Sequence, residues 1–183
     1  MNIILAGDSL TEGMNVTAHL PGYRVLNKGV YGDNLEGLIS RIHRDVISNN
    51  PDLLFILIGT NDFALGRSNA EMMISFKKMI DQLAGSLPDC SIYISSLLPT
   101  REIENRPNER IEEINRHLEV LVNEAGFGFL PLHEIFTDES GMLRKEATTD
   151  GLHLSEKGYD LWAEVLEKYI RFHLSERKSA VSN

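Results

Sequence analysis

Most of the predicted architecture follows from one N-terminal stretch, Ile3-Ile4-Leu5-Ala6-Gly7-Asp8-Ser9-Leu10-Thr11-Glu12. Its short, continuous apolar run predicts a buried parallel strand. Gly7 gives the backbone freedom where this strand ends, and Asp8-Ser9 supplies local capping groups. The Ser9 hydroxyl is therefore expected at the C-terminal edge of the first strand, where ligands bind in open α/β sheets. Asp-Ser pairs in such places more often serve as plain turn or cap residues, so the stretch alone does not establish catalysis.

Length and charge narrow the class of protein. The 183 residues fit one domain with a full core, and the formal net charge is −9. This charge argues against a nucleic-acid or anionic membrane surface, which needs clustered Lys and Arg. No apolar run approaches the roughly 18 residues of a membrane span. The sequence shows no basic, cleavable leader, and Cys90 is alone, so we expect a cytoplasmic protein in which Cys90 is structural.

Strand-like and helix-like segments alternate along the chain without repeats or a linker. After the first strand we expect strands at about 23–27, 53–58, 91–98 and 127–132. Apolar residues at helical spacing predict intervening helices at about 35–47, 69–84, 111–125 and 155–170. This pattern predicts a three-layer α/β/α domain over residues 1–175 around a mainly parallel sheet, followed by a polar tail at 176–183.

Such a sheet brings distant loops to one edge. Ser9, Gly32 and Asn61 each follow a strand or lie in a strand-to-helix loop, so we expect them to converge. The polar loop Thr100–Pro107 should be exposed at the same edge. Its Arg101 and Arg106 are candidates for an anionic substrate group, although solvated loop charges are the commoner case.

Serine attack on an ester needs a base and a group that orients the base. His153 lies in a loop before a helix, and Asp150 precedes it at a spacing that brings a carboxylate to the imidazole Nδ1. A plain turn at Asp150-Gly151 explains the spacing about as well. His133, next to Glu134, is a rival base, whereas Asp8 is too close to Ser9 in sequence to be a good orienting group.

Oxyanion donors are also available. The backbone N–H groups of Ser9 and Gly32 and the side-chain amide of Asn61 are suitable, since glycine lets the backbone approach a substrate closely. Gly32 is equally explained as a loop residue with positive φ, and Asn61 as a turn or cap residue.

Four blocks of the sequence resemble those of the GDSL, or SGNH, hydrolases. They are Gly7-Asp8-Ser9-Leu10, Gly32 within 27–34, Gly59-Thr60-Asn61-Asp62 and Asp150-Gly151-Leu152-His153. The resemblance covers nearly the whole chain. It implies that Ser9 is the nucleophile, His153 the base and Asp150 its orienting group, with the Ser9 N–H, Gly32 and Asn61 as the oxyanion hole. It also implies a flavodoxin-like sheet of about five strands and no metal or organic cofactor.

The sequence thus predicts a serine esterase that forms an acyl-enzyme on a small-molecule ester. No long apolar lid segment is evident, which favours small or short-acyl esters, with acetylated carbohydrates among the candidates. A lysophospholipase, a thioesterase or an acyltransferase would use the same triad, and a non-catalytic binding module is a more remote alternative. The loops 62–68 and 100–107 should shape the pocket. Nothing in the sequence indicates an oligomeric state.

Overall fold

Five short strands, all parallel, form the sheet that the apolar runs predict. The computed structural model describes residues 1–181, with side chains through residue 175. The spatial order of the strands is β2-β1-β3-β4-β5. Their bounds are β1 Ile3–Gly7, β2 Val25–Gly29, β3 Leu53–Leu57, β4 Ser91–Ser95 and β5 Gly128–Leu130.

Alternation along β1 divides the core into two halves. Ile4 and Ala6 belong to one apolar cluster, whereas Ile3 and Leu5 belong to a second cluster on the other face of the sheet. All four side chains are almost completely buried, as expected for a strand with helices on both faces. The register aligns β1 with both neighbours, so that Gly7 pairs with Gly29 of β2 and with Leu57 of β3.

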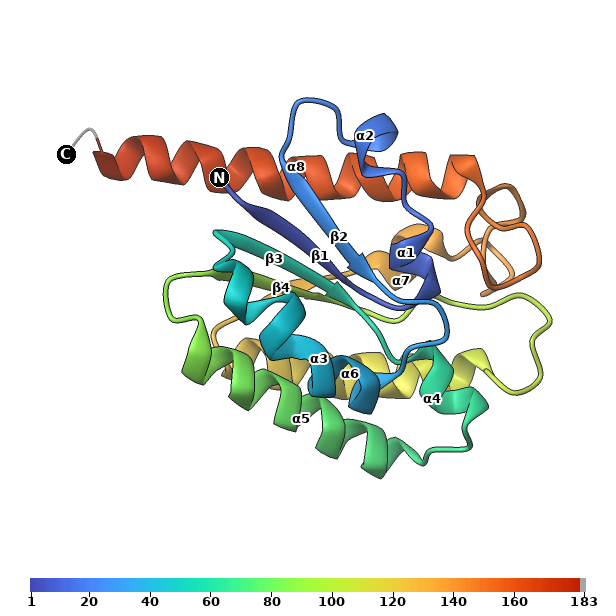
Figure 1. Cartoon of the computed structure of the whole chain (residues 1–183). Helices are drawn as coiled ribbons and strands as arrows, with labels where there is room; N and C mark the ends of the chain where they lie inside the picture. Colours follow the sequence, from blue (N-terminus) through green and yellow to red (C-terminus); the bar gives the residue numbers. More distant parts are fainter. Residues whose placement is uncertain (182–183) are drawn as a thin grey trace.

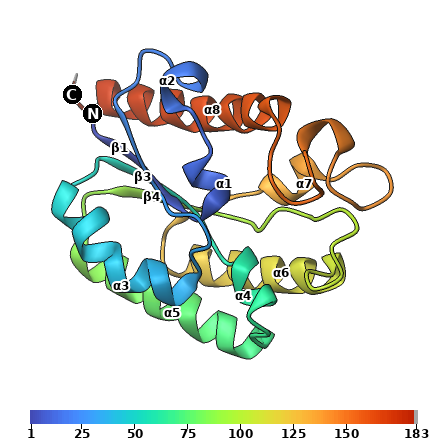
Figure 2. The ribbon, with the colours of Figure 1, turned by 45° about the vertical axis from the view of Figure 1, so that its right-hand side comes forward.

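Helices cover both faces of the sheet (Figures 1 and 2). The face with Ile4 is covered by α3, α5 and α6, and the face with Ile3 mainly by α8, with α1 and α7 beside it. The three-layer α/β/α prediction is therefore confirmed. The helix bounds are α1 Ser9–Glu12, α2 Val16–His19, α3 Leu35–Asp45, α4 Thr60–Ala64, α5 Asn69–Ser86, α6 Asn108–Glu124, α7 Leu132–Phe136 and α8 Glu156–Val181, with short 3-10 turns at Ile47–Asn49 and Lys145–Ala147.

Strand ends differ from the predicted ones where other hydrogen-bond partners replace the sheet. The strand expected to reach residue 98 ends at Ser95. Beyond it, the Leu97 backbone bonds to the side chain of Asn115 on α6, with N–H to Oδ1 at 2.7 Å and Nδ2 to Leu97 O at 3.0 Å. This side chain satisfies the backbone of an apolar segment that has left the ladder, an arrangement that apolar periodicity does not reveal.

The last helix, α8, continues through Val181, beyond the predicted boundary at residue 175. Residues 182–183 of the predicted polar tail lie outside the described residues. No helix in the described part of the chain is both long and apolar enough to cross a membrane.

The fold collects loops at one edge of the sheet. In Figure 1, α1, α4 and the loops that lead to α8 lie at the right-hand side, where the strands end. Ser9 begins α1 after β1, Gly32 lies between β2 and α3, and Asn61 lies in α4 after β3. The carboxyl ends of three adjacent parallel strands therefore supply the predicted site residues, as the topology requires.

Candidate active site

Ser9 is the first residue of α1, immediately after the turn that ends β1. The Asp8 carboxylate caps the helix by accepting the Leu10 N–H at 3.0 Å. Gly7 permits this turn because a Cβ on it would lie 2.1 Å from the Leu57 carbonyl oxygen of β3. Helix geometry supplies no intrahelical acceptor for the Ser9 N–H, which is thus suited to bind an oxygen outside the helix.

Ser9, His153 and Asp150 form one hydrogen-bonded chain. Ser9 Oγ lies 3.2 Å from His153 Nε2, and His153 Nδ1 lies 2.8 Å from Asp150 Oδ2. These residues are 144 positions apart in the chain at their widest separation, and the sheet brings them together. A hydroxyl, an imidazole and a carboxylate in this order form the arrangement that activates serine for acyl transfer.

Asp150 holds the backbone of the loop as well as the imidazole. Its Oδ1 accepts the N–H groups of His153 at 2.7 Å and Leu152 at 3.0 Å. Partial desolvation raises the pKa of Asp150, but the hydrogen bonds from His153 and Leu152 outweigh it and hold this pKa below its ordinary value. An ionised carboxylate only accepts, so His153 Nδ1 carries the proton and Nε2 presents its lone pair to Ser9.

The loop that carries His153 is anchored to the segment after β4. Arg101 donates its backbone N–H to Gly151 O at 2.8 Å, and the Thr148 hydroxyl donates to His153 O at 2.8 Å. Gly151 has φ +88°, and a Cβ there would lie 2.1 Å from Arg101 O. Only glycine fits this close approach without moving one of the two loops.

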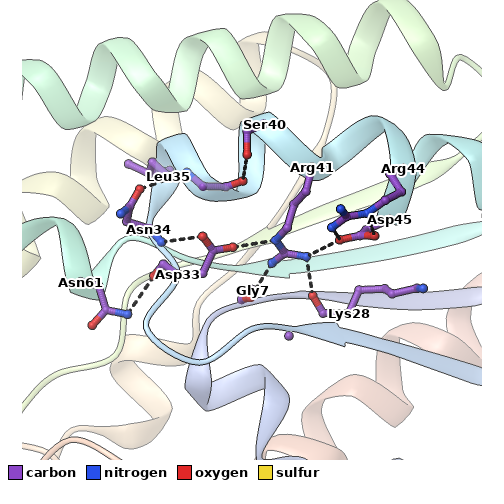
Figure 3. A network of polar contacts seen from close by, with 12 residues as sticks. Gly7, Lys28, Asp33, Asn34, Leu35, Ser40, Arg41, Arg44, Asp45 and Asn61 are labelled. Carbon is purple, nitrogen blue, oxygen red and sulfur yellow. Dashed lines mark hydrogen bonds and ion pairs between the residues drawn. The ribbon is translucent and has the colours of Figure 1, made fainter.

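Asp33, the residue after Gly32, connects the Gly32 loop to Asn61. Asn61 Nδ2 donates to Asp33 O at 2.8 Å, and Gly32, directly before Asp33, has φ +72°. Figure 3 shows the Arg41 guanidinium between Asp33 and Asp45, next to Gly7. The guanidinium donates to Asp33 Oδ2 at 2.7 Å and to Gly7 O at 2.9 Å, which links the Gly32 loop to the end of β1.

Two further carboxylates at this edge have structural contacts. Asp62 accepts the Leu35 N–H at 3.0 Å and so caps α3; desolvation raises its pKa. Asp8 is 1% exposed, and this burial raises its pKa to about 7. The hydrogen bond from the Leu10 N–H lowers the pKa, but by less than burial raises it. Neither carboxylate is hydrogen-bonded to His153, whereas Asp150 is, at 2.8 Å from Nδ1.

The rival base, His133, makes no hydrogen bond to Ser9 among the described residues, and its buried Nε2 has no hydrogen-bond partner there. It lies in α7, its backbone N–H donates to Ser96 Oγ at 2.7 Å, and its Nδ1 lies 3.4 Å from Thr137 Oγ1. Burial lowers the pKa of this imidazole. Cys90 is no rival nucleophile, because burial and the nearby Asp52 raise its pKa to about 12.

The expectation that Arg101 and Arg106 are solvated loop charges is wrong. Arg101 donates from Nε to Leu143 O at 2.7 Å and forms an ion pair with Asp138. Arg106 is 9% exposed and donates to Thr60 O at 3.0 Å and to Asn61 Oδ1 at 3.1 Å. The loop 100–107 looks exposed in sequence because it is polar. Its two glutamates are exposed, but its two arginine side chains bind carbonyl, amide and carboxylate oxygens of the protein.

Sequence reasoning also missed Tyr31. Its side chain is 74% exposed, and its ring lies nearly parallel to the His153 imidazole, at 9° with the centroids 6.5 Å apart. Tyr31 lies between two glycines of a loop, where the sequence shows neither helix nor strand periodicity, so no sequence pattern indicates its position next to His153. Among the described residues, no cluster of His, Cys, Asp and Glu is arranged to hold a metal ion.

Known proteins resemble this chain in sequence and in fold. N-acylneuraminate cytidylyltransferase of Escherichia coli O18:K1:H7 is 29% identical over 160 residues, which are 86% of this chain but only 38% of that protein. A solved structure from Streptococcus pneumonia, provisionally described as a platelet activating factor, is 30% identical with a TM-score of 0.86, covering 92% of this chain and 83% of the other. A GDSL-like lipase from Bacteroides thetaiotaomicron VPI-5482, 22% identical, shares the fold with a TM-score of 0.81 over 93% of this chain and 87% of its own.

The sequence profile of the GDSL-like Lipase/Acylhydrolase family matches residues 5–161. This range begins within β1 and reaches into α8, so it contains the turn of Ser9, the loop of Gly32, helix α4 with Asn61, and the loop 150–153. The chain therefore belongs to the GDSL-like lipase/acylhydrolase family.

Proposed function

We propose that this hydrolase is a serine esterase that cleaves carboxylic esters through an acyl-enzyme on Ser9. The observation that carries the proposal is the chain of contacts from Ser9 Oγ to His153 Nε2 at 3.2 Å and from His153 Nδ1 to Asp150 Oδ2 at 2.8 Å. Both distances fit a base that accepts the serine proton while its second nitrogen remains bonded to a carboxylate.

The proposed reaction proceeds in two halves. Ser9 Oγ attacks the ester carbonyl as its proton passes to His153 Nε2, and the imidazolium then protonates the departing alcohol oxygen. The acyl group remains on Ser9 as an ester. A water then gives a proton to His153 and attacks the acyl carbonyl; the imidazolium returns this proton to Ser9 Oγ, and the carboxylic acid is released. Asp150 stabilises the imidazolium in both halves.

Three donors are proposed to stabilise the oxyanion of each tetrahedral intermediate. They are the backbone N–H groups of Ser9 and Gly32 and one N–H of the Asn61 amide. The bond from Asn61 to Asp33 O uses only one of the two amide hydrogens, which leaves the second for a ligand. Removal of one such donor in other serine hydrolases costs about 10²- to 10³-fold in kcat.

The proposed substrates are small or short-acyl esters. The His153 and Asp150 side chains are 35% and 52% exposed, and Tyr31 stands exposed beside the imidazole. An open site of this kind suits a short acyl group whose alcohol part rests against the tyrosine ring, since an aromatic face binds flat apolar groups well. Acetylated carbohydrates meet this description.

Hydrolysis of a p-nitrophenyl ester series, from acetate to palmitate, tests both parts of the proposal. Acetylated sugars and a lysophospholipid extend the series. Ser9→Ala should lower kcat at least about 10³-fold on every substrate, because the attacking oxygen is lost. Ser48→Ala, which removes an exposed serine hydroxyl remote from His153, is the matched control and should retain full activity. Turnover by Ser9→Ala near the wild-type rate would refute the nucleophile assignment.

A further inference from the structure

A buried guanidinium, that of Arg106, binds the side-chain oxygen of the proposed oxyanion donor Asn61. Arg106 reaches α4 from the loop 100–107, donating from Nε to Thr60 O at 3.0 Å and from Nη2 to Asn61 Oδ1 at 3.1 Å. With 9% of its surface exposed, it is one of the few buried charged residues in the part of the chain whose side chains are described. The two acceptors are consecutive in the chain, so one side chain holds both the backbone and the amide at this position.

This contact determines which way the Asn61 amide points. A guanidinium can only donate hydrogen bonds, so the amide must turn its oxygen towards Arg106. Its nitrogen then faces the opposite side, where Nδ2 donates to Asp33 O at 2.8 Å, and Asp33 follows Gly32 in the chain. The amide is thus held through both its oxygen and its nitrogen, and its second N–H has no acceptor among the described residues. A rotated amide would present an oxygen to the oxyanion and repel it.

The hydrogen-bond acceptors of the Arg106 guanidinium are unusual for a buried cation. Its acceptors in the described part of the chain are neutral oxygens: Thr60 O, Asn61 Oδ1 and Asn105 Oδ1. A buried cation without a hydrogen-bonded carboxylate is costly, and a negative charge that develops nearby reduces this cost. Hydrogen bonds to a charged donor are stronger than neutral ones and polarise the accepting group. Polarisation of the Asn61 amide makes its nitrogen a better donor.

We propose that Arg106 is a positioning residue of the oxyanion hole, which fixes the Asn61 amide with its N–H towards the substrate oxygen and strengthens that N–H as a donor. This inference rests on the proposed esterase activity and assigns Arg106 to transition-state stabilisation rather than to substrate binding. It replaces the simpler interpretation of Arg106 as a loop charge that meets an anionic substrate group, because Nε and Nη2 are occupied within the protein.

A double-mutant cycle in the full-length enzyme tests the assignment. The variants are Arg106→Gln, Asn61→Ala and the combination of both, with kcat and KM measured on p-nitrophenyl acetate. Arg106→Gln should lower kcat about 10- to 100-fold with KM changed less than about threefold, since only the transition state carries the full negative charge. The combined variant should be no slower than Asn61→Ala alone, because Arg106 acts through the amide that has already been removed.

Arg110→Gln is the matched control. Arg110 also contacts α4, with its guanidinium 4.8 Å above the Phe63 ring, and its Nη2 donates to Arg67 O at 2.8 Å, but it has no hydrogen bond to Asn61. Its loss should leave kcat within about twofold of the wild type, which separates the effect of the Asn61 contact from the general loss of one positive charge near α4.

Three results would overturn the assignment: wild-type kcat in Arg106→Gln, a change in KM alone, or losses that multiply in the combined variant. If Arg106→Gln unfolds below the assay temperature, Arg106→Lys replaces it in the same cycle, with its charge and one or more donors retained, and multiplied losses again refute the proposal. Absence of any ester hydrolysis by the wild type is a separate result, which contradicts the esterase and not the Asn61 contact.

Discussion

At the scale of single residues, Asp150 uses its two carboxylate oxygens for different purposes. Oδ2 binds the imidazole, and Oδ1 accepts two backbone N–H groups of the same loop. Asp150→Asn keeps an oxygen for the backbone but replaces the acceptor of Nδ1–H with a group that can donate. The fold should therefore persist while the imidazole adopts the wrong tautomer.

We expect Asp150→Asn to lower kcat by up to about 10⁴-fold, with the melting temperature lowered by no more than about 4 °C because the site is half exposed. Hydrolysis of p-nitrophenyl acetate and a thermal scan of the same sample measure both quantities. A loss below about tenfold would show that another group, such as a water or a backbone carbonyl, orients the imidazole instead.

Asp8 makes a second prediction at the residue scale, through pH. Burial raises its pKa from 3.8 to about 7 in the folded protein, so its protonation contributes stability that is present below the unfolded-state pKa and is lost as pH rises through about 7. Asp8→Asn removes this dependence and can still cap Leu10.

The free energy of unfolding of Asp8→Asn, relative to the wild type, should therefore rise between about pH 5 and about pH 8, by on the order of 1 kcal/mol or more. Urea unfolding of both proteins at the two pH values measures it. An unchanged difference would show that Asp8 titrates normally, and a difference that falls with pH would contradict a raised pKa of Asp8.

At the scale of elements, the loop of Gly151 is held by its contact with Arg101. Gly151→Ala adds a Cβ that would lie 2.1 Å from Arg101 O, at φ +88°. Gly126→Ala is a matched control after α6, where φ is +75° but no atom lies within 4 Å of the added Cβ. Both variants carry the cost of a left-handed alanine, about 1 kcal/mol, but only the first must also move a loop.

Gly151→Ala should lower the melting temperature more than Gly126→Ala and reduce kcat at least about tenfold, because His153 is displaced from Ser9. Gly126→Ala should leave kcat unchanged. Equal effects of the two variants on kcat would mean that the Arg101 contact does not hold the catalytic loop.

Elements could be predicted from the sequence wherever apolar side chains mark a buried face. The continuous run before Gly59 gave the central strand β3, and helical spacing of Met72, Phe76 and Met79 gave α5. Prediction failed for polar segments that are buried by hydrogen bonds. Arg106 and Asn115 bind backbone carbonyls and amides from loops distant in sequence, and nothing in their neighbours distinguishes them from solvated residues.

At the scale of the whole molecule, the parallel topology accounts for the site. The residues proposed for catalysis occupy four separate segments of the chain, and the strand order places β2, β1 and β3 side by side. Spacing in the sequence could suggest that Asp150 and His153 pair, but only the arrangement of the sheet and α8 brings His153 to Ser9. The roles of these residues, the cytoplasmic location and the absence of a nucleic-acid partner remain predictions.

Active-site labelling tests the central claim, that His153 activates Ser9, most directly. Folded wild-type protein is treated with a fluorophosphonate, and the modified residue is identified by peptide mass spectrometry. We expect modification of Ser9 alone, and a labelling rate reduced at least about 10³-fold in His153→Gln, since the base is lost. Labelling of another residue, no labelling of the folded protein, or an unchanged rate in His153→Gln would contradict the account.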